Sequence, residues 1–290
     1  MKKPVLILAF LVIQMVTSFA QDTLVITKKI VYKKVGNKEL SVDMFYTASS
    51  QQKKENTAIA LFHGGGWVFG DPSEFYEACR RFARKGFVTF SFQYRLSRNE
   101  DGTYPHPEIT PVESTKDARS AIRWIRENAV LLKINPDKIV VGGQSAGGQL
   151  ALATALLDSI NEISDNMKFS PVPNALLLYS SNVNTMEAWV DMLFGDRRNE
   201  IWSISPYHNL KKPMPPVIEF RGDEDDQVLP YTVSMFKAKI LELGNYYEEY
   251  VYPGRKHYLA AGNKKYATYF DEEILEKTDA FLEKFGFGKD

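Results

Sequence analysis

The sequence is poor in residues that would cross-link a small protein or hold a metal ion. Cys79 is its single cysteine, so no intramolecular disulfide can form. Only four of its 290 residues are histidine. A chain of this length buries enough surface to fold without a disulfide or a metal ion, and we expect no metal and no other cofactor. Because Cys79 falls in a predicted helix, we expect its thiol to pack rather than react.

An excess of charge of one sign is also missing. Lys+Arg and Asp+Glu both number 36, so the formal net charge is zero. The hydrophobic content of 44% and charged content of 25% are typical of soluble globular proteins. Without a basic excess, a nucleic-acid partner is not expected. The charge balance leaves the oligomeric state open.

The first twenty residues have the three parts of a secretory signal peptide. Lys2 and Lys3 precede an almost wholly apolar run over 5–16, and small residues at Ser18 and Ala20 precede Gln21. The alternative is an uncleaved anchor, but the run is short for a membrane span of about 20 residues. We therefore predict that residues 1–20 are removed and that residues 21–290 are exported to the periplasm or outside the cell. No stable membrane insertion is expected after removal.

Hydrophobic patterning predicts an α/β fold for the mature chain. Residues 23–46 alternate between apolar and polar, as in an antiparallel hairpin, and a polar loop follows over 49–56. From residue 57 short buried strands alternate with amphipathic helices, which indicates a mostly parallel sheet with helices on both faces. The expected strands are 58–62, 87–90, 138–141, 175–178, 217–220 and 247–252, and the expected helices are 74–85, 114–128, 146–158, 231–243 and 271–285.

One segment interrupts this alternation. Residues 182–216 are rich in Trp, Met, Pro and Asn and show no clear period. The segment is too long for an ordinary connection. We predict a small lid-like or cap-like insertion with one or two helices; the alternative is a long, partly ordered connection.

The strongest chemical motif is G-x-S-x-G at Gly143, Ser145 and Gly147. A predicted buried strand precedes it and a helix follows. In that setting the serine sits on a tight, strained turn that raises its Oγ above the edge of the sheet. We therefore predict that Ser145 is a nucleophile.

A glycine-rich loop directly follows the predicted strand 58–62, with the sequence His63-Gly64-Gly65-Gly66-Trp67. Three successive glycines cost backbone entropy, so backbone amides are expected close to a ligand. We predict that the amides of Gly65, Gly66 and Ala146 stabilise an oxyanion. Alone, the loop is equally consistent with a tight structural turn or an anion-binding loop.

The position of the histidines selects a candidate base. Chain order in this type of fold is serine, acid, histidine, and His257 alone follows the last predicted strand. His208 is the weaker alternative, His106 falls in a loop between two prolines, and His63 is expected to orient the glycine loop.

The acid is expected in the loop 221–228, which follows the strand 217–220. This loop offers four carboxylates, and the residues alone do not choose between them: Asp223, Glu224, Asp225 and Asp226.

Together these motifs resemble the HGGG-type esterases of the α/β-hydrolase superfamily, and more narrowly the bacterial acetylxylan, feruloyl and acetyl esterases. The resemblance runs from about residue 38 to the C-terminus. It rests on the glycine loop followed by Gly70-Asp71, on the serine motif, and on further positions that match the family: Tyr94-Arg95-Leu96, Asp117, Trp124, Ser205-Pro206 and Pro215-Pro216.

The resemblance also selects the acid. Gly222, Asp225 and Val228 match the family's G-x-x-D-x-x-V, which implies a triad of Ser145, Asp225 and His257. The sequence departs from the family at three positions: Arg221 stands where His is usual, Gln144 where Asp is common, and Tyr258 where Gly is common. We assign substrate-binding or loop-supporting roles to a further group: His63, Gly64, Trp67 and Gln144.

The resemblance implies a secreted serine esterase that cleaves short-chain esters of polysaccharides or related small molecules. Acetyl esters are favoured over feruloyl esters, and the expected partner is a small-molecule or oligosaccharide ester. Two rivals are a serine peptidase or lipase on the same fold and a non-catalytic binding protein of this fold. The second rival is disfavoured, because such proteins usually lose the serine or the histidine and this chain keeps both.

Overall fold

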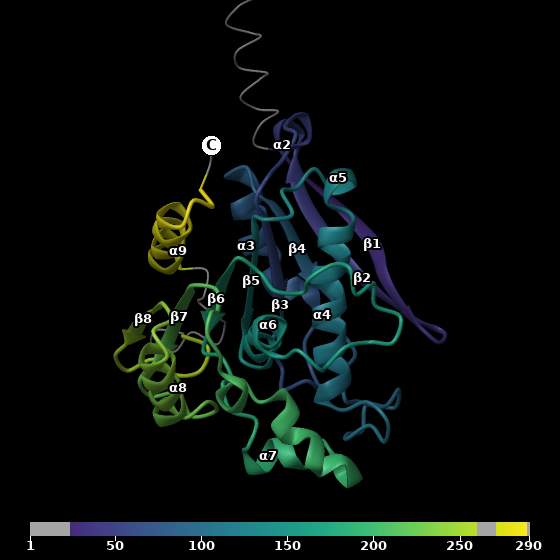
Figure 1. The fold of residues 1–290 in the computed structure, drawn as a ribbon, viewed down its shortest axis with the longest axis vertical. Coiled ribbons are helices and arrows are strands. Elements are labelled where there is room, and N and C mark those ends of the chain that lie inside the picture. The colour runs from purple at the N-terminus through teal and green to yellow at the C-terminus, as the bar shows by residue number, and fades with distance from the viewer. Residues whose placement is uncertain (1–23, 260–270, 289–290) are drawn as a thin grey trace, which may run out of the picture.

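The computed structural model describes residues 24–259 and 271–288 (Figure 1). The predicted signal peptide, residues 1–20, lies outside the described residues. The described strands form one eight-stranded sheet in the order β1-β2-β4-β3-β5-β6-β7-β8. The pairs β1–β2 and β2–β4 are antiparallel, and all the other pairs are parallel. This confirms the predicted sheet with its antiparallel hairpin at the N-terminal side.

The inner strands are buried along their whole length, because helices cover both faces of the sheet. The strands are β1 Val25–Val35, β2 Lys38–Thr47, β3 Ala58–Phe62, β4 Val88–Phe92, β5 Ile139–Gln144, β6 Ala175–Tyr179, β7 Val217–Gly222 and β8 Tyr247–Tyr252.

Of the described helices, all but the last connect successive strands, and the last follows β8. They are α2 Ala48–Gln52, α3 Tyr76–Arg84, α4 Pro111–Glu127, α5 Ala129–Leu132, α6 Ala146–Leu156, α7 Ala188–Asp191, α8 Pro230–Glu242 and α9 Glu272–Lys284, with 3-10 turns η1 Pro72–Phe75, η2 Gly195–Ile204 and η3 Tyr207–Asn209. Within the described residues, no helix combines the length and the apolar character needed to cross a membrane.

Along each inner strand, successive side chains pack alternately into two separate hydrophobic cores. Leu176 and Leu178 of β6 pack with residues of α4, α6 and α8, whereas Leu177 packs with residues of α3 and α9. Figure 1 shows these two helical layers on opposite sides of the sheet. Cys79 of α3 lies in the second core, where burial raises the pKa of its thiol to about 12. The thiol is therefore a packing group, as expected.

Two short helices were not expected from the sequence. The predicted polar loop 49–56 begins with α2, where Thr47 and Ser50 form a reciprocal capping box. Helix α5 follows α4 after a single residue, and its exposed Val130 and Leu131 gave no amphipathic signal. Both helices lie outside the strand–helix alternation that the pattern captured.

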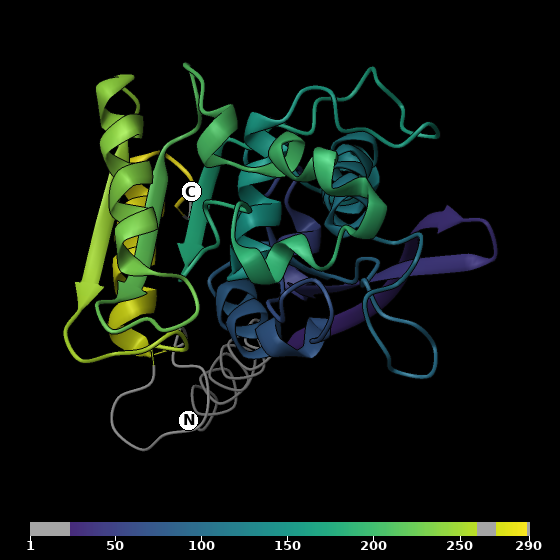
Figure 2. The same ribbon diagram turned by 90° about the horizontal axis from the view of Figure 1, so that it is seen from below.

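The segment 182–216 contains α7, η2 and η3. These turns lie beyond the carboxyl ends of the parallel strands, as the view from below shows (Figure 2). Arg197 of η2 binds both carboxylate oxygens of Glu113 in α4, at 2.9 and 3.0 Å, which ties the segment to the main domain. The segment thus contains short helices, and its assignment as a lid-like or cap-like insertion stays a prediction.

A buried ionic cluster joins the hairpin to the central domain. Asp117 of α4 is fully buried, and its Oδ1 lies 2.6 Å from Nζ of Lys33 in β1. Its Oδ2 accepts hydrogen bonds from the backbone nitrogen and Nε of Arg95, at 2.9 and 2.8 Å. Without Asp117 both cations would keep only the less buried carboxylate of Glu162, which lies 3.1 Å from Lys33 Nζ and 2.7 Å from Arg95 Nη2.

We expect Asp117→Ala to lower the free energy of unfolding by about 3 kcal/mol, since it leaves the two buried cations Lys33 and Arg95 with the single carboxylate of Glu162. Urea denaturation of the two proteins measures the difference. Glu39→Ala is the matched control, because its pair with Lys34 is exposed and is worth less than about 1 kcal/mol. Equal losses in the two variants would contradict the argument.

A second buried carboxyl group lies in the middle of β7. Glu219 is fully buried, and its Oε1 accepts a hydrogen bond from the backbone nitrogen of Ser181 at 2.9 Å. Its Oε2 has no hydrogen-bond partner among the residues that the structure describes. Burial raises the pKa of Glu219 from 4.5 to about 8, and the nearby negative charges of Glu249 and Asp225 add to that effect.

This raised pKa predicts a pH-dependent cost. Between pH 4.5 and about 8 the folded protein holds a proton on Glu219 that the unfolded chain releases, so stability falls as the pH rises. We expect the free energy of unfolding of Glu219→Gln to rise relative to that of the wild type by about 1.4 kcal/mol per pH unit within that window. Below the window the difference between the two proteins should not change with pH. Urea denaturation between pH 4 and pH 8 measures this difference, with exposed Glu39→Gln as the control; a pH-independent difference would contradict it.

Candidate active site

The candidate nucleophile occupies a strained turn between a strand and a helix. Ser145 has φ 53° and ψ −118°, directly after β5 and directly before α6. A positive φ is unfavourable for a residue with a Cβ atom. Two backbone hydrogen bonds hold the turn: the Ser145 nitrogen donates to the Tyr179 oxygen, and the Asn182 nitrogen donates to the Ser145 oxygen, both at 3.0 Å.

The glycines of the G-x-S-x-G motif are required by close backbone packing. A Cβ atom on Gly143 would lie 2.2 Å from the Gly147 oxygen, and one on Gly147 would lie 2.0 Å from the Phe62 oxygen. Neither neighbour can give way, because both are backbone atoms. The motif is therefore explained by the space that the turn leaves, independently of any substrate.

The glycine loop lies beside this turn. Gly65 and Gly66 have φ values of +100° and +61°, and a Cβ atom on Gly65 would lie 2.3 Å from the Phe69 oxygen. Both glycines line the same cavity as Ser145. Ala146 is the first residue of α6, where backbone N–H groups lack a partner within the helix. The three predicted oxyanion donors thus lie around the candidate nucleophile, and their role stays a prediction.

His63 supports the glycine loop. It is buried and stacks on Tyr94 at a ring distance of 4.3 Å, and its Nδ1 lies 2.8 Å from the Gly64 oxygen. Burial lowers the pKa of His63 to about 4, so the ring is neutral near pH 7. These contacts suit the loop-orienting role expected of His63 and not that of a base at Ser145.

His257 and Asp225 form a buried pair at the cavity. The Nδ1 atom of His257 lies 3.0 and 2.9 Å from the two carboxylate oxygens of Asp225. Asp225 Oδ1 also accepts hydrogen bonds from the backbone nitrogens of Gln227 and Val228, both at 2.9 Å. These bonds fix the carboxylate, and His257 lines the cavity together with Ser145.

The other three acids of the loop are not paired with His257 Nδ1. Asp223 accepts a hydrogen bond from the Gly254 nitrogen at 2.7 Å, Asp226 pairs with Lys256 at the surface, and Glu224 is exposed. Asp225 alone among the four is buried. The geometry therefore agrees with the choice that the resemblance made.

The two remaining histidines lie in other contacts. Nδ1 of His106 accepts hydrogen bonds from the nitrogens of Glu108 and Ile109, both at 3.0 Å. His208 lies in η3 with its Nδ1 2.8 Å from Ser205 Oγ.

Gln144 and Gly64 connect the base to the glycine loop. The side-chain Nε2 of Gln144 lies 3.0 Å from Nε2 of His257. On the other side of the amide, a Cβ atom on Gly64 would lie 1.9 Å from Gln144 Oε1, so a side chain at residue 64 would displace the Gln144 amide.

Trp67 is fully buried, and its Nε1 donates to Gln149 Oε1 at 3.1 Å. Its ring stacks on Trp189, which does line the cavity, at 5.7 Å. Trp67 therefore supports the glycine loop from its buried side and does not itself line the cavity.

The cavity around Ser145 measures about 540 Å³. Most of the residues that line it were not predicted from the sequence. Four aromatic rings from separate segments are partly exposed at its rim: Phe69, Tyr104, Trp189 and Tyr258. The richness of 182–216 in Trp and Met was the one signal that pointed to Trp189 and Met192. The remaining lining residues are Val68, Leu193, Asp226, Gln227 and Val228.

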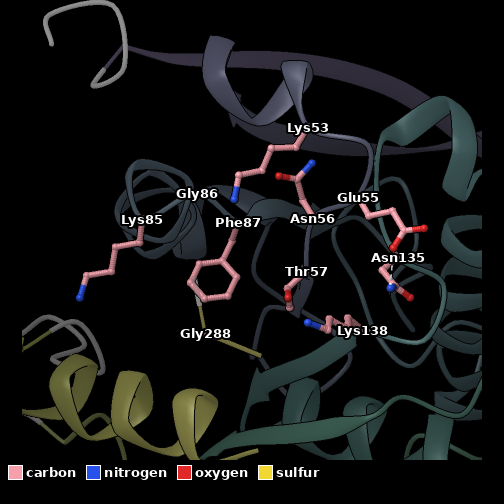
Figure 3. Close-up of a pocket in the computed structure, with 10 residues that line it drawn as sticks. All are labelled: Lys53, Glu55, Asn56, Thr57, Lys85, Gly86, Phe87, Asn135, Lys138 and Gly288. Carbon is pink, nitrogen blue, oxygen red and sulfur yellow. Dashed lines mark hydrogen bonds between the residues drawn. The ribbon is translucent and has the colours of Figure 1, made fainter. Parts of the chain in front are cut away.

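A smaller pocket of about 110 Å³ lies at the amino-terminal end of the parallel strands. Figure 3 shows the side chains around it, which include Lys53, Thr57 and Lys138. Thr57 directly precedes β3 and Lys138 directly precedes β5, whereas Ser145 directly follows β5. In parallel α/β sheets ligands bind at the carboxyl ends of the strands, so the cavity at Ser145 is the candidate active site.

Known proteins are similar to parts of this chain. The family model described as BD-FAE matches residues 42–177, a range that holds the glycine loop and the serine motif but ends before Asp225 and His257. An arylesterase of Saccharolobus solfataricus is 34% identical over 136 residues, which cover 46% of this chain and 41% of that protein. Lipase 2 of Moraxella sp. is 33% identical over 111 residues, which cover 38% of this chain and 24% of that protein. The alignments thus span less than half the length of these two relatives.

Solved structures extend the similarity to nearly the whole chain. Esterase 2 of Thermogutta terrifontis, phosphoramylated by tabun, has a TM-score of 0.80 and 30% identity, over 91% of this chain and 96% of that chain. The same esterase with propionate bound gives the same scores and coverage. The sheet order, the serine turn and this full-length similarity lead to one conclusion: the chain belongs to the carboxylesterases of the α/β-hydrolase superfamily.

Proposed function

We propose that the protein is a secreted serine esterase that hydrolyses short-chain carboxylic esters. The observation that carries the proposal is the buried His257–Asp225 pair, whose histidine lines one cavity with Ser145, Gly65 and Gly66. A histidine oriented by a carboxylate can take a proton from a serine hydroxyl, and preorganised amides can stabilise the oxyanion that forms.

The reaction has two steps in this proposal. His257 Nε2 takes the hydroxyl proton of Ser145 while Oγ bonds to the ester carbonyl carbon, and the collapse of the oxyanion expels the alcohol, which receives that proton. Water then attacks the acyl-enzyme by the reverse sequence and releases the acid. Asp225 holds Nδ1 and stabilises the imidazolium, and the amides of Gly65, Gly66 and Ala146 bind the oxyanion in both steps.

Three features support short acyl esters of sugars or related small molecules. The similar Thermogutta terrifontis esterase has been solved with propionate and with butyrate bound. The cavity of about 540 Å³ has room for a ring beside a short acyl group. The rings at its rim, such as Tyr104 and Trp189, offer faces on which a sugar or an aromatic group can stack. Acetyl and feruloyl esters of polysaccharide both fit this description, with acetyl preferred.

Export is part of the same proposal. It rests on residues 1–20, whose charged start, apolar run and small residues before Gln21 are those of a secretory signal. An exported esterase meets polymeric and oligomeric esters outside the cytoplasm, which agrees with a polysaccharide substrate.

We expect Ser145→Ala to lower kcat for 4-nitrophenyl acetate by a factor on the order of 10⁶, because the nucleophile of both steps is lost. Steady-state kinetics of the purified mature protein measure the loss, and circular dichroism checks that the variant folds. A folded variant that keeps the wild-type rate would contradict the assignment.

We expect Asp225→Asn to lower kcat for the same ester by about 10³–10⁴-fold, because an amide no longer fixes the tautomer of His257 or stabilises its imidazolium. Glu224→Gln is the matched control, since it neutralises an exposed acid of the same loop that does not line the cavity. If the two variants lose the same activity, Asp225 is not the acid of a triad.

A further inference from the structure

The reactive nitrogen of the proposed base has a neighbour that the triad does not use. Gln144 directly precedes Ser145 and is buried. Its amide Nε2 lies 3.0 Å from Nε2 of His257. The other ring nitrogen, Nδ1, faces both oxygens of Asp225, which only accept hydrogen bonds when ionised. Nδ1 therefore carries the hydrogen, and Nε2 presents a lone pair to the amide.

The amide is well placed to donate to this lone pair. Residue 144 ends β5, where its backbone pairs with Tyr179 of β6. The Oε1 atom lies on the other side of the amide, next to Gly64, where the absence of a side chain leaves room for it. Strand and glycine loop together leave the Gln144 amide nitrogen directed at His257.

We propose that Gln144 is a positioning residue that keeps His257 in the neutral form that a base requires. Its N–H donates to the lone pair of Nε2 in the resting enzyme, which favours the neutral imidazole over the imidazolium. When an ester binds, the Ser145 hydroxyl takes over the lone pair and passes its proton to it. This inference rests on the proposed esterase function and adds to it a reason for an amide, rather than a carboxylate, at residue 144.

The charge of residue 144 then sets the pH range of activity. A carboxylate at this position can only accept, so it stabilises the imidazolium Nε2–H and removes the free base at low pH. The other titratable groups that face His257 come from three segments and are unchanged in such a variant: Asp225 and Asp226 after β7, Glu187 before α7, and Tyr258 on the same loop.

The test compares kcat/KM for 4-nitrophenyl acetate between pH 4 and pH 9 in wild type, Gln144→Glu, Gln144→Met and Gln227→Glu. We expect Gln144→Glu to move the acidic limb of the profile upward by about one pH unit or more, a tenfold loss on that limb. Gln144→Met, which lacks the donor and offers only a weak, uncharged acceptor, moves the acidic limb less. Gln227→Glu places the same charge on the cavity wall, away from His257 Nε2, and we expect it also to move the acidic limb less than Gln144→Glu does.

An acidic limb that stays in place in Gln144→Glu, or moves equally in Gln227→Glu, would overturn the inference. The pH dependence of the rate of labelling by a fluorophosphonate gives the same comparison without a substrate. If Gln144→Glu does not fold, the Gln144→Met profile decides: an unchanged limb overturns the inference, and an upward shift supports it. An inactive and unlabelled wild type would instead refute the esterase proposal itself, so the two failures are distinguishable.

Discussion

The geometry of the site depends on one strained residue. Ser145 keeps φ at 53° because β6 and the segment after it hold its backbone from both sides. Such a conformation costs about 1–3 kcal/mol and persists only where the surroundings impose it. The fully buried strands β5 and β6, and the close contacts of Gly143 and Gly147, supply that constraint. Oγ is thereby presented at the cavity without any need for flexibility in the serine itself.

The other groups reach the serine from loops at the same edge of the sheet. The glycine loop follows β3, the acid follows β7 and the base follows β8. The parallel strands therefore bring to one end of the sheet loops that are far apart in sequence; His63 and His257, for example, are 194 positions apart. The segment 182–216 closes the remaining side through Trp189 and is anchored to α4 by Arg197. A rigid sheet thus positions the chemistry, and the loops and the insertion shape what can enter.

Much of this arrangement could be predicted from the sequence, because strong local patterns produced it. The strands expected at 58–62 and 247–252 match β3 and β8 residue for residue. Motifs with steric causes, such as Gly143 and Gly147, identified the serine turn. Asp225 could be chosen only through the family resemblance, since what distinguishes the four acids physically is burial and hydrogen bonding, which the tertiary fold determines. The contact of Gln144 with His257 could not be predicted either, nor could the gathering of the aromatic rings at the rim, because each joins segments far apart in the chain.

The most direct measurement of the central claim is peptide mapping by mass spectrometry after treatment of the mature protein with paraoxon. The similar Thermogutta terrifontis esterase has been solved phosphorylated by this reagent. A nucleophile activated as described here acquires one diethylphosphoryl group per chain, on the peptide that contains Ser145. A folded protein that remains unmodified, or that is modified at another residue, would contradict the account.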